Sequence, residues 1–152
     1  MPLLLRAVNT PAKVQTRRGV ISTAEDDQVI PYVQARVAPG ENILVYPYLP
    51  LYYYLTDTLS ASRYEYFQPG MHTLQQAREM IAELSSERVR VILFEASFWE
   101  KIPSAWPETP LAAIAHDPVA DYIQGRYRAC QSLSSPNNGH FLFMVPKELA
   151  CP

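Results

Sequence analysis

The chain has 152 residues, of which 48% are hydrophobic and 18% are charged, with a net charge of −2. This composition argues against disorder, the charge argues against nucleic acid as a partner, and no window approaches the about 20 apolar residues of a membrane-spanning helix. We therefore expect a single domain over residues 1–152, with its core at about residues 12–147.

The first third of the chain alternates between extended and helical patterns. Residues 12–21 are rich in β-branched side chains, which predicts a first strand. A helix is expected over residues 22–37, because Ser and Thr at its start can cap it and valines recur at every fourth position. Asn42–Tyr46 reads as a short buried strand, and "LPLYYYLTD" predicts a brief helix directly after it.

The middle of the chain contains a loop, a well-marked helix and a central strand. Residues 58–72 are loop-like, and Pro69-Gly70 is the clearest turn signal in them. Thr73 is expected to cap the next helix, with Gln76 completing a capping box. "VRVILFE" (89–95) then predicts a central strand, followed by an irregular segment with three prolines.

The last third of the chain is expected to hold one helix and a terminal hairpin or strand. Asp117 can cap a helix that has Pro118 at its first position. The chain is expected to become extended after Gly125, and Asn138-Gly139 is a tight-turn signal before a last strand, "FLFMVPK". The whole order predicts an α/β fold: a three-layer α/β/α sandwich with a mostly parallel sheet and an antiparallel C-terminal strand or hairpin.

Common cofactor and catalytic motifs are absent from the sequence. The turn "GVISTAEDD" lacks the glycines of a dinucleotide site and the lysine of a phosphate-binding loop. No serine has the spacing of G-x-S-x-G, and no histidine pair has the spacing of metal ligands. We therefore expect no cofactor and no bound metal, and the catalytic residues remain unknown.

The carboxyl edge of the predicted sheet is the best place for a ligand, because open α/β sheets bind ligands there. Glu95 ends the central strand, and Trp99 follows it. Tyr46 and Tyr48 end the preceding strand, so they are expected to face the same crevice. Aromatic rings beside a carboxylate suit a sugar or another flat polar ligand.

Tyr52 and Tyr53, in the helix that follows, have two readings. One places them in the same ligand site. The other places Tyr52 to Tyr54 partly packed and partly exposed on a short helix, with hydroxyls in water, and the pattern favours this second reading.

Two other polar groups are candidates. Arg63 and Tyr64 lie in a loop, where an arginine either binds a phosphate or carboxylate or pairs with a surface glutamate. His116 beside Asp117 suggests a base and the group that orients it, but a helix-capping role for Asp117 is the favoured alternative. Cys130 and Cys151 match no metal or redox motif; Cys130 reads as a core thiol, and a disulfide is the alternative in an oxidising compartment.

Several segments together resemble one family. "PGENILVYPYLPLYYYLTDTLSASRYEYFQPG", "VRVILFE" and "DPVADYIQGRY" look like the soluble C-terminal domain of bacterial GT-C class, polyprenyl-phosphate-sugar-dependent mannosyltransferase-like membrane glycosyltransferases. The resemblance covers roughly residues 13–147, and its matching site positions are Tyr46, Tyr48, Tyr52, Tyr53 and Arg63.

The resemblance implies a location and a role. In that family the catalytic acidic residues lie in loops between membrane helices, so this chain is expected to lack transferase activity alone. The expected location is extracytoplasmic (periplasmic), and the expected partners are the membrane-embedded part of the transferase or a glycan. The chain is then an excised domain or an independent gene product; for an independent product, a cytoplasmic location is the expectation.

Two other functions stay open. One is a small stand-alone enzyme that uses the carboxyl edge, with Glu95 and His116 as acid or base. The other is an interaction module whose tyrosine surface binds a protein or a membrane interface.

Overall fold

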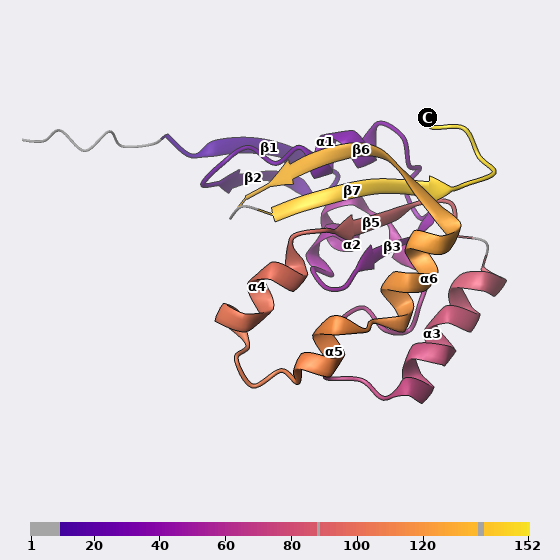
Figure 1. The fold of residues 1–152 in the computed structure, drawn as a ribbon. Coiled ribbons are helices and arrows are strands. Elements are labelled where there is room, and N and C mark those ends of the chain that lie inside the picture. The colour runs from indigo at the N-terminus through magenta and orange to yellow at the C-terminus, as the bar shows by residue number, and fades with distance from the viewer. Residues whose placement is uncertain (1–9, 88, 137–138) are drawn as a thin grey trace, which may run out of the picture.

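The computed structural model describes residues 10–87, 89–136 and 139–152 (Figure 1). One five-stranded sheet consists of β3 (Asn42–Tyr46), β4 (Leu59–Ser60), β5 (Ile92–Glu95), β6 (Tyr127–Ser135) and β7 (Gly139–Pro146). Its spatial order is β4-β3-β5-β7-β6. β3 runs parallel to β4 and β5, whereas β7 runs antiparallel to both β5 and β6.

The prediction of an α/β fold with a C-terminal antiparallel hairpin is confirmed, but the prediction of a mostly parallel sheet is not. Pairing in the sheet is mostly antiparallel, because the long β6–β7 hairpin supplies much of the ladder and β7 also pairs with β5. Asn138 of the predicted hairpin turn lies outside the described residues.

The prediction of one continuous strand over residues 12–21 is wrong. Residues 12–23 form a separate antiparallel hairpin of β1 (Ala12–Thr16) and β2 (Gly19–Thr23) that is outside the five-stranded sheet. The guanidinium of Arg17, at the hairpin turn, donates to the carbonyl oxygens of Gln34, Val37 and Thr56 at 2.6–2.9 Å. The turn is therefore held by contacts with residues that are distant in sequence.

The helix predicted from residue 22 begins later. It is α1 (Val29–Gln34), and the carboxylate of Asp27 accepts hydrogen bonds from the backbone N–H groups of Val29 and Ile30. The predicted valine stripe is confirmed as a buried surface, since Val29 and Val33 are fully buried.

Three helices agree with the sequence predictions. α2 (Leu51–Thr56) follows β3. α3 (Leu74–Ser86) has the predicted capping box between Thr73 and Gln76. α6 (Pro118–Arg126) begins with the predicted cap, because the Asp117 carboxylate accepts from the N–H groups of Val119 and Ala120.

Two further helices follow β5, one within the segment predicted to be irregular (97–110) and one directly after it. They are α4 (Phe98–Ala105), which includes Pro103, and α5 (Leu111–Ala115). α4 forms here because Phe98 and Ile102, one helical turn apart, are both fully buried.

Hydrophobic side chains cover the sheet on both faces. Alternate residues of β3 point to opposite sides, so Ile43 and Val45 join one buried cluster with α1 and α2, while Leu44 and Tyr46 join another with α3 and α6. Figure 1 shows α3 and α6 on one side of the strands. Within the described ranges, no helix has the length and apolar character needed to span a membrane.

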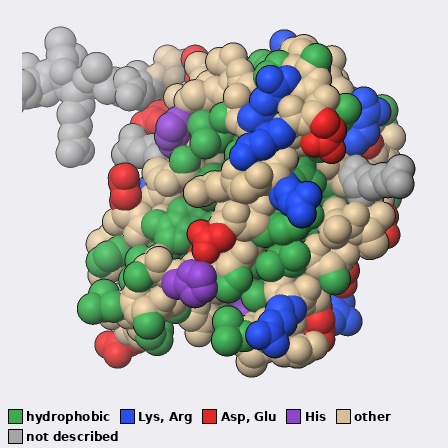
Figure 2. Space-filling model, turned by 45° about the vertical axis from the view of Figure 1, so that its right-hand side comes forward, with side chains coloured by type: hydrophobic (Ala, Val, Ile, Leu, Met, Phe, Trp, Pro, Cys, Tyr) green, Lys and Arg blue, Asp and Glu red, His purple; other side chains and the backbone are tan. Residues whose placement is uncertain are grey.

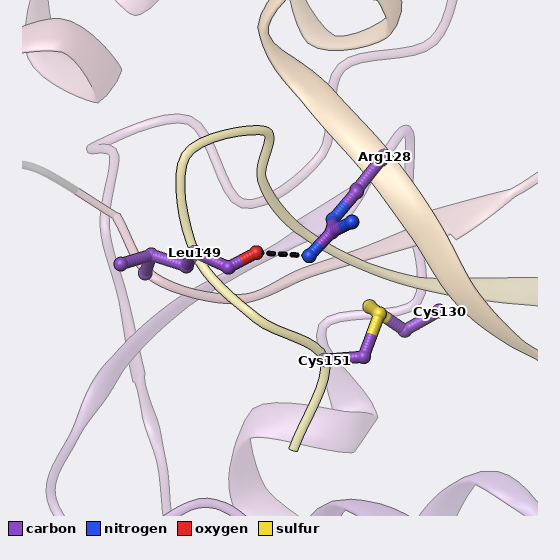
Figure 3. Close-up of a disulfide and its surroundings, with 4 residues drawn as sticks. All are labelled: Arg128, Cys130, Leu149 and Cys151. Carbon is purple, nitrogen blue, oxygen red and sulfur yellow. Dashed lines mark hydrogen bonds between the residues drawn. A yellow bond between two sulfur atoms is a disulfide. The ribbon is translucent and has the colours of Figure 1, made fainter.

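The two cysteines are joined, so the core-thiol prediction for Cys130 is wrong. Cys130 of β6 forms a disulfide with Cys151, and the two Cα atoms are 5.6 Å apart. Figure 3 shows the C-terminal segment curving back to β6, where Arg128 donates a hydrogen bond to the carbonyl oxygen of Leu149. The segment is thus tied to the edge strand by one covalent and one polar contact.

Candidate functional site

A cluster of four aromatic residues lies beyond the carboxyl ends of β3 and β5. We call Tyr48, Tyr66, Phe98 and Trp106 the aromatic edge. The ring centroid of Tyr48 is 4.8 Å from that of Phe98, 6.0 Å from Tyr66 and 6.1 Å from Trp106. Phe98 is fully buried at the base, whereas the other three rings are partly exposed. The aromatic edge is therefore a surface of aromatic rings that packs on the hydrophobic core through Phe98.

Two polar atoms of the aromatic edge have no hydrogen-bond partner among the described residues. Within the described residues, the hydroxyl of Tyr48 and the indole N–H of Trp106 form no hydrogen bond, whereas the Tyr66 hydroxyl donates to Gln68 at 2.7 Å. Half-buried Tyr and Trp side chains usually find a partner for these groups. A ligand that stacks on the rings could therefore form hydrogen bonds with the Tyr48 hydroxyl, which donates and accepts, and with the Trp106 N–H, which donates.

Glu95 lies at the end of β5 and is almost fully buried, with 1% of its side chain exposed. One carboxylate oxygen accepts from the N–H groups of Ser97 and His140, at 3.1 and 3.2 Å, and from the Ser97 hydroxyl. The other accepts no hydrogen bond from a described residue and lies 3.9 Å from the ammonium of Lys101. Glu95 is therefore held rigidly at the sheet edge.

The electrostatic effect of Glu95 reaches the aromatic edge. The pKa of Tyr48 is raised, first by burial, then by the negative charge of Glu95, and then by electrostatic interaction with the neighbouring Tyr66 phenol. A raised pKa keeps this phenol neutral, so its hydroxyl can donate as well as accept. Tyr48 and Glu95 are thus the two residues of the predicted crevice that lie beyond or at the carboxyl ends of β3 and β5.

Trp99 and Tyr46 lie on the α3 and α6 side of the sheet. Trp99 stacks on Phe94 with 5.1 Å between ring centroids, and Tyr46 stacks on Phe94 at 5.9 Å. Tyr46 has no exposed surface, and its hydroxyl donates to Asp117 at 2.6 Å. Tyr46 is therefore a core residue here, and it does not face solvent beside Tyr48.

The pKa values of this buried pair are both raised. For Tyr46 the main cause is burial, followed by the charge of Asp117; for Asp117 the main cause is burial, which outweighs the hydrogen bonds it accepts. The Asp117 carboxylate is thus occupied by Tyr46 and by the start of α6. The helix-capping alternative for Asp117 is confirmed.

Tyr52 and Tyr53 are buried, with their hydroxyls used inside the protein. The Tyr52 hydroxyl donates to Asp27 at 2.8 Å. The Tyr53 hydroxyl accepts from the N–H of Val45 at 2.7 Å, on the side of β3 where the two-residue β4 ends. Tyr54 is 60% exposed, so the favoured reading of a partly packed and partly exposed Tyr52 to Tyr54 is confirmed. It is wrong only in placing the hydroxyls of Tyr52 and Tyr53 in water.

Arg63 and Tyr64 form an ion-pair network with α3. Arg63 pairs with Glu79 and lies 3.4 Å from Glu83, while the Tyr64 hydroxyl donates to Glu79 at 2.7 Å. Hydrogen bonding to the Tyr64 hydroxyl is the main cause of a lowered pKa for Glu79. The structure thus shows the glutamate pairing that was one of two predictions for Arg63.

The described contacts of His116 do not include Glu95. Its Nδ1 is 3.3 Å from Asp121, and the ring is exposed. It lines a cleft of ≈ 270 Å³ with His72, Thr73 and other residues near the start of α3, and Glu95 is not among the lining residues. The described contacts therefore do not join His116 and Glu95 in one site.

Tyr66 and Trp106 were missed from the sequence. Both lie in segments without a regular pattern, and nothing local indicates that they meet Tyr48. The available signal was that each is an aromatic residue in a segment with proline, Trp106 directly before Pro107 and Tyr66 three residues before Pro69. Among the described residues, no group of three or more His, Cys, Asp or Glu side chains is placed to hold a metal ion.

Comparisons with protein families, curated proteins and solved structures found no match to this chain. The functional interpretation therefore depends on the side chains described above.

Proposed function

We propose that the chain is a non-catalytic domain of, or derived from, a bacterial membrane glycosyltransferase, and that its aromatic edge contacts a glycan or a lipid-linked sugar. The two hydrophobic clusters, one on each face of the sheet, support a three-layer α/β/α arrangement for this domain. The sequence resemblance supports the link with the glycosyltransferase family.

One observation carries the proposal of glycan contact. The aromatic edge combines partly exposed rings with a Tyr48 hydroxyl and a Trp106 N–H that have no partner in the described residues. The apolar C–H face of a sugar stacks on such rings, and its hydroxyls can bind the two free polar groups. Glu95, at the end of β5, pairs with Lys101 of α4, the helix that also carries Phe98.

The disulfide supports an extracytoplasmic location. Disulfides persist in oxidising compartments such as the bacterial periplasm and are rare in the cytosol. The Cys130–Cys151 bridge in this chain is therefore compatible with the face of the membrane on which lipid-linked sugars are used.

An NMR titration against a panel of soluble oligosaccharides tests this function. We expect chemical-shift changes at Tyr48, Tyr66 and Trp106, and we expect Tyr48→Ala to weaken binding about fivefold through loss of ring contact. Tyr48→Phe retains the ring over Phe98 and removes only the hydroxyl, so it separates loss of binding from local unfolding.

Tyr54→Ala is the matched control, because Tyr54 is an exposed tyrosine of α2 outside the aromatic edge. It should leave the titration unchanged. The absence of shifts at the aromatic edge with every oligosaccharide would contradict glycan contact.

A second candidate function is a protein or membrane interaction module. Leu51 and Tyr54 are both more than half exposed and lie three residues apart on α2, so they share one helix face. Co-sedimentation with liposomes, compared between the wild type and Leu51→Ser/Tyr54→Ser, distinguishes membrane binding from glycan binding.

A further inference from the structure

A cleft of ≈ 520 Å³ lies where α3, α6 and β7 end, away from the aromatic edge. Its lining includes Arg90, which precedes β5, and Arg126, the last residue of α6. We call it the basic cleft. Its volume is within the range of small-molecule sites in proteins.

Positive charge gathers around the basic cleft. Lys147 donates to the carbonyl oxygen of Gly125 at 2.9 Å, and Arg128 donates to that of Leu149, which places both cations beside the lining residues. Figure 2 turns this side of the molecule forward and shows Lys and Arg side chains gathered in its upper part. In the described lining, Glu148 is the acidic side chain, so the cations prevail locally in a chain of net charge −2.

The guanidinium groups of Arg90 and Arg126, which line the basic cleft, have no polar partner among the described residues. In the part of the chain that the structure describes, neither Arg90 nor Arg126 forms a side-chain hydrogen bond or an ion pair. Arg17 and Arg63, by contrast, bind carbonyl oxygens and glutamates respectively. Two arginine side chains that open on one cleft are well suited to an oxyanion, since the guanidinium matches phosphate geometry.

The rest of the lining is largely apolar. Leu84 and Val89 are buried, and the buried ring of Tyr127 is satisfied by donating its hydroxyl to the Val89 carbonyl at 2.9 Å. Tyr122 also lines the cleft, and its hydroxyl has no hydrogen bond within the described residues. The cleft therefore presents cations and one free hydroxyl next to an apolar floor.

We propose that the basic cleft binds a phosphate ester that carries an apolar group. Arg90 and Arg126 bind the phosphate oxygens, Tyr122 donates a further hydrogen bond, and Leu84 and Val89 contact the apolar part. This site does not depend on the aromatic edge or on glycan contact. The phosphate is supplied either by a soluble ester or by a lipid headgroup, which share the same chemistry.

The test uses the full chain and three probes: inorganic phosphate, hexyl phosphate, and phosphatidylcholine vesicles with or without phosphatidic acid. In NMR titrations we expect hexyl phosphate to shift the signals of Arg90, Arg126 and Tyr122 and to bind more tightly than inorganic phosphate. Arg90→Gln/Arg126→Gln should weaken hexyl phosphate binding about tenfold, because two charged hydrogen-bond donors are lost.

The control Lys13→Gln/Arg78→Gln removes the same charge from exposed positions outside the lining of the basic cleft and should leave binding unchanged. Vesicle binding that needs phosphatidic acid and is lost in Arg90→Gln/Arg126→Gln identifies a lipid headgroup as the source. Binding of hexyl phosphate without vesicle binding identifies a soluble ester. Equal losses in both double variants, or no shift at the cleft with hexyl phosphate, would overturn the proposal. Neither result affects the oligosaccharide titration, which reports on the aromatic edge.

Discussion

Two regions on opposite faces of the sheet use the same arrangement of a tyrosine, an aspartate and the start of a helix. Tyr46 donates to Asp117 at the start of α6, and Tyr52 donates to Asp27 at the start of α1. In each pair, one carboxylate oxygen accepts two backbone N–H groups and the other accepts the phenol. The chemistry is the same, but the surroundings differ.

The Tyr46 phenol is sealed in the core, whereas the Tyr52 phenol reaches a surface cleft. The two carboxylates do not differ in this way, since Asp117 and Asp27 are 9% and 8% exposed and each lines a cleft. Tyr46 has no exposed area and is packed between aromatic rings. Tyr52 and Asp27 both line a surface cleft of ≈ 220 Å³. Water can replace a lost partner of the Tyr52 hydroxyl but not of the Tyr46 hydroxyl, so the same hydrogen bond should contribute differently to stability.

Removing each carboxylate should have the largest effect. We expect Asp117→Ala to lower the free energy of unfolding by about 3 kcal/mol, because it leaves a buried hydroxyl and two N–H groups unpaired. Asp27→Ala should cost about 1.5 kcal/mol, since water can reach the Tyr52 hydroxyl that it frees, whereas the Tyr46 hydroxyl is fully buried. Urea unfolding followed by circular dichroism measures both. Equal losses would show that exposure does not distinguish the pairs.

Removing each hydroxyl is a milder version of the same comparison. We expect Tyr46→Phe to cost about 1.5 kcal/mol and Tyr52→Phe about 0.7 kcal/mol, because each carboxylate keeps its backbone donors. Tyr54→Phe, at an exposed tyrosine, is the control and should change the unfolding free energy little. A larger loss for Tyr52→Phe than for Tyr46→Phe would contradict the assignment of Tyr46 as the sealed phenol.

The smallest expected effect is the change in the unfolding free energy with pH. Burial raises the pKa of Asp117 in the folded state. As the pH rises, the carboxyl of Asp117 therefore loses its proton in the unfolded chain before it does so in the folded protein. The stability that protonated Asp117 contributes is fully present below the ordinary pKa of an aspartate, and it is lost as the pH passes through the raised pKa of the folded state. The unfolding free energy of the wild type relative to Asp117→Asn should therefore fall with rising pH and then become constant. A rising difference would contradict the direction of the shift.

Local signals predicted the elements that depend on neighbouring residues. The capping box of Thr73 and Gln76 and the Asp117-Pro118 start both act within one helical turn, so α3 and α6 could be read from the sequence. The hairpin at residues 12–23 could not. Its turn has none of the Asn-Gly type signals, and Arg17 is held there by carbonyl groups of α1, α2 and the residues that follow α1.

The candidate site was predictable only in part, for a similar reason. The sequence correctly placed Glu95 at the end of β5 and Tyr48 beyond the end of β3. It could not tell which tyrosine hydroxyls would find internal partners, because the partner of Tyr46 is 71 residues away. Trp106 reaches the aromatic edge only through the packing of α4.

The hydroxyl of Tyr53 has a consequence for how the molecule behaves at high concentration. β4 covers β3 for only two residues, and the next N–H on that side, from Val45, is bound by Tyr53, while Phe67 donates to the Pro47 carbonyl further along. An exposed strand edge is a template on which another chain can add a strand and start aggregation. Here a side chain and a loop fill the positions that an added strand would occupy, so this margin of the sheet is protected from edge-to-edge aggregation.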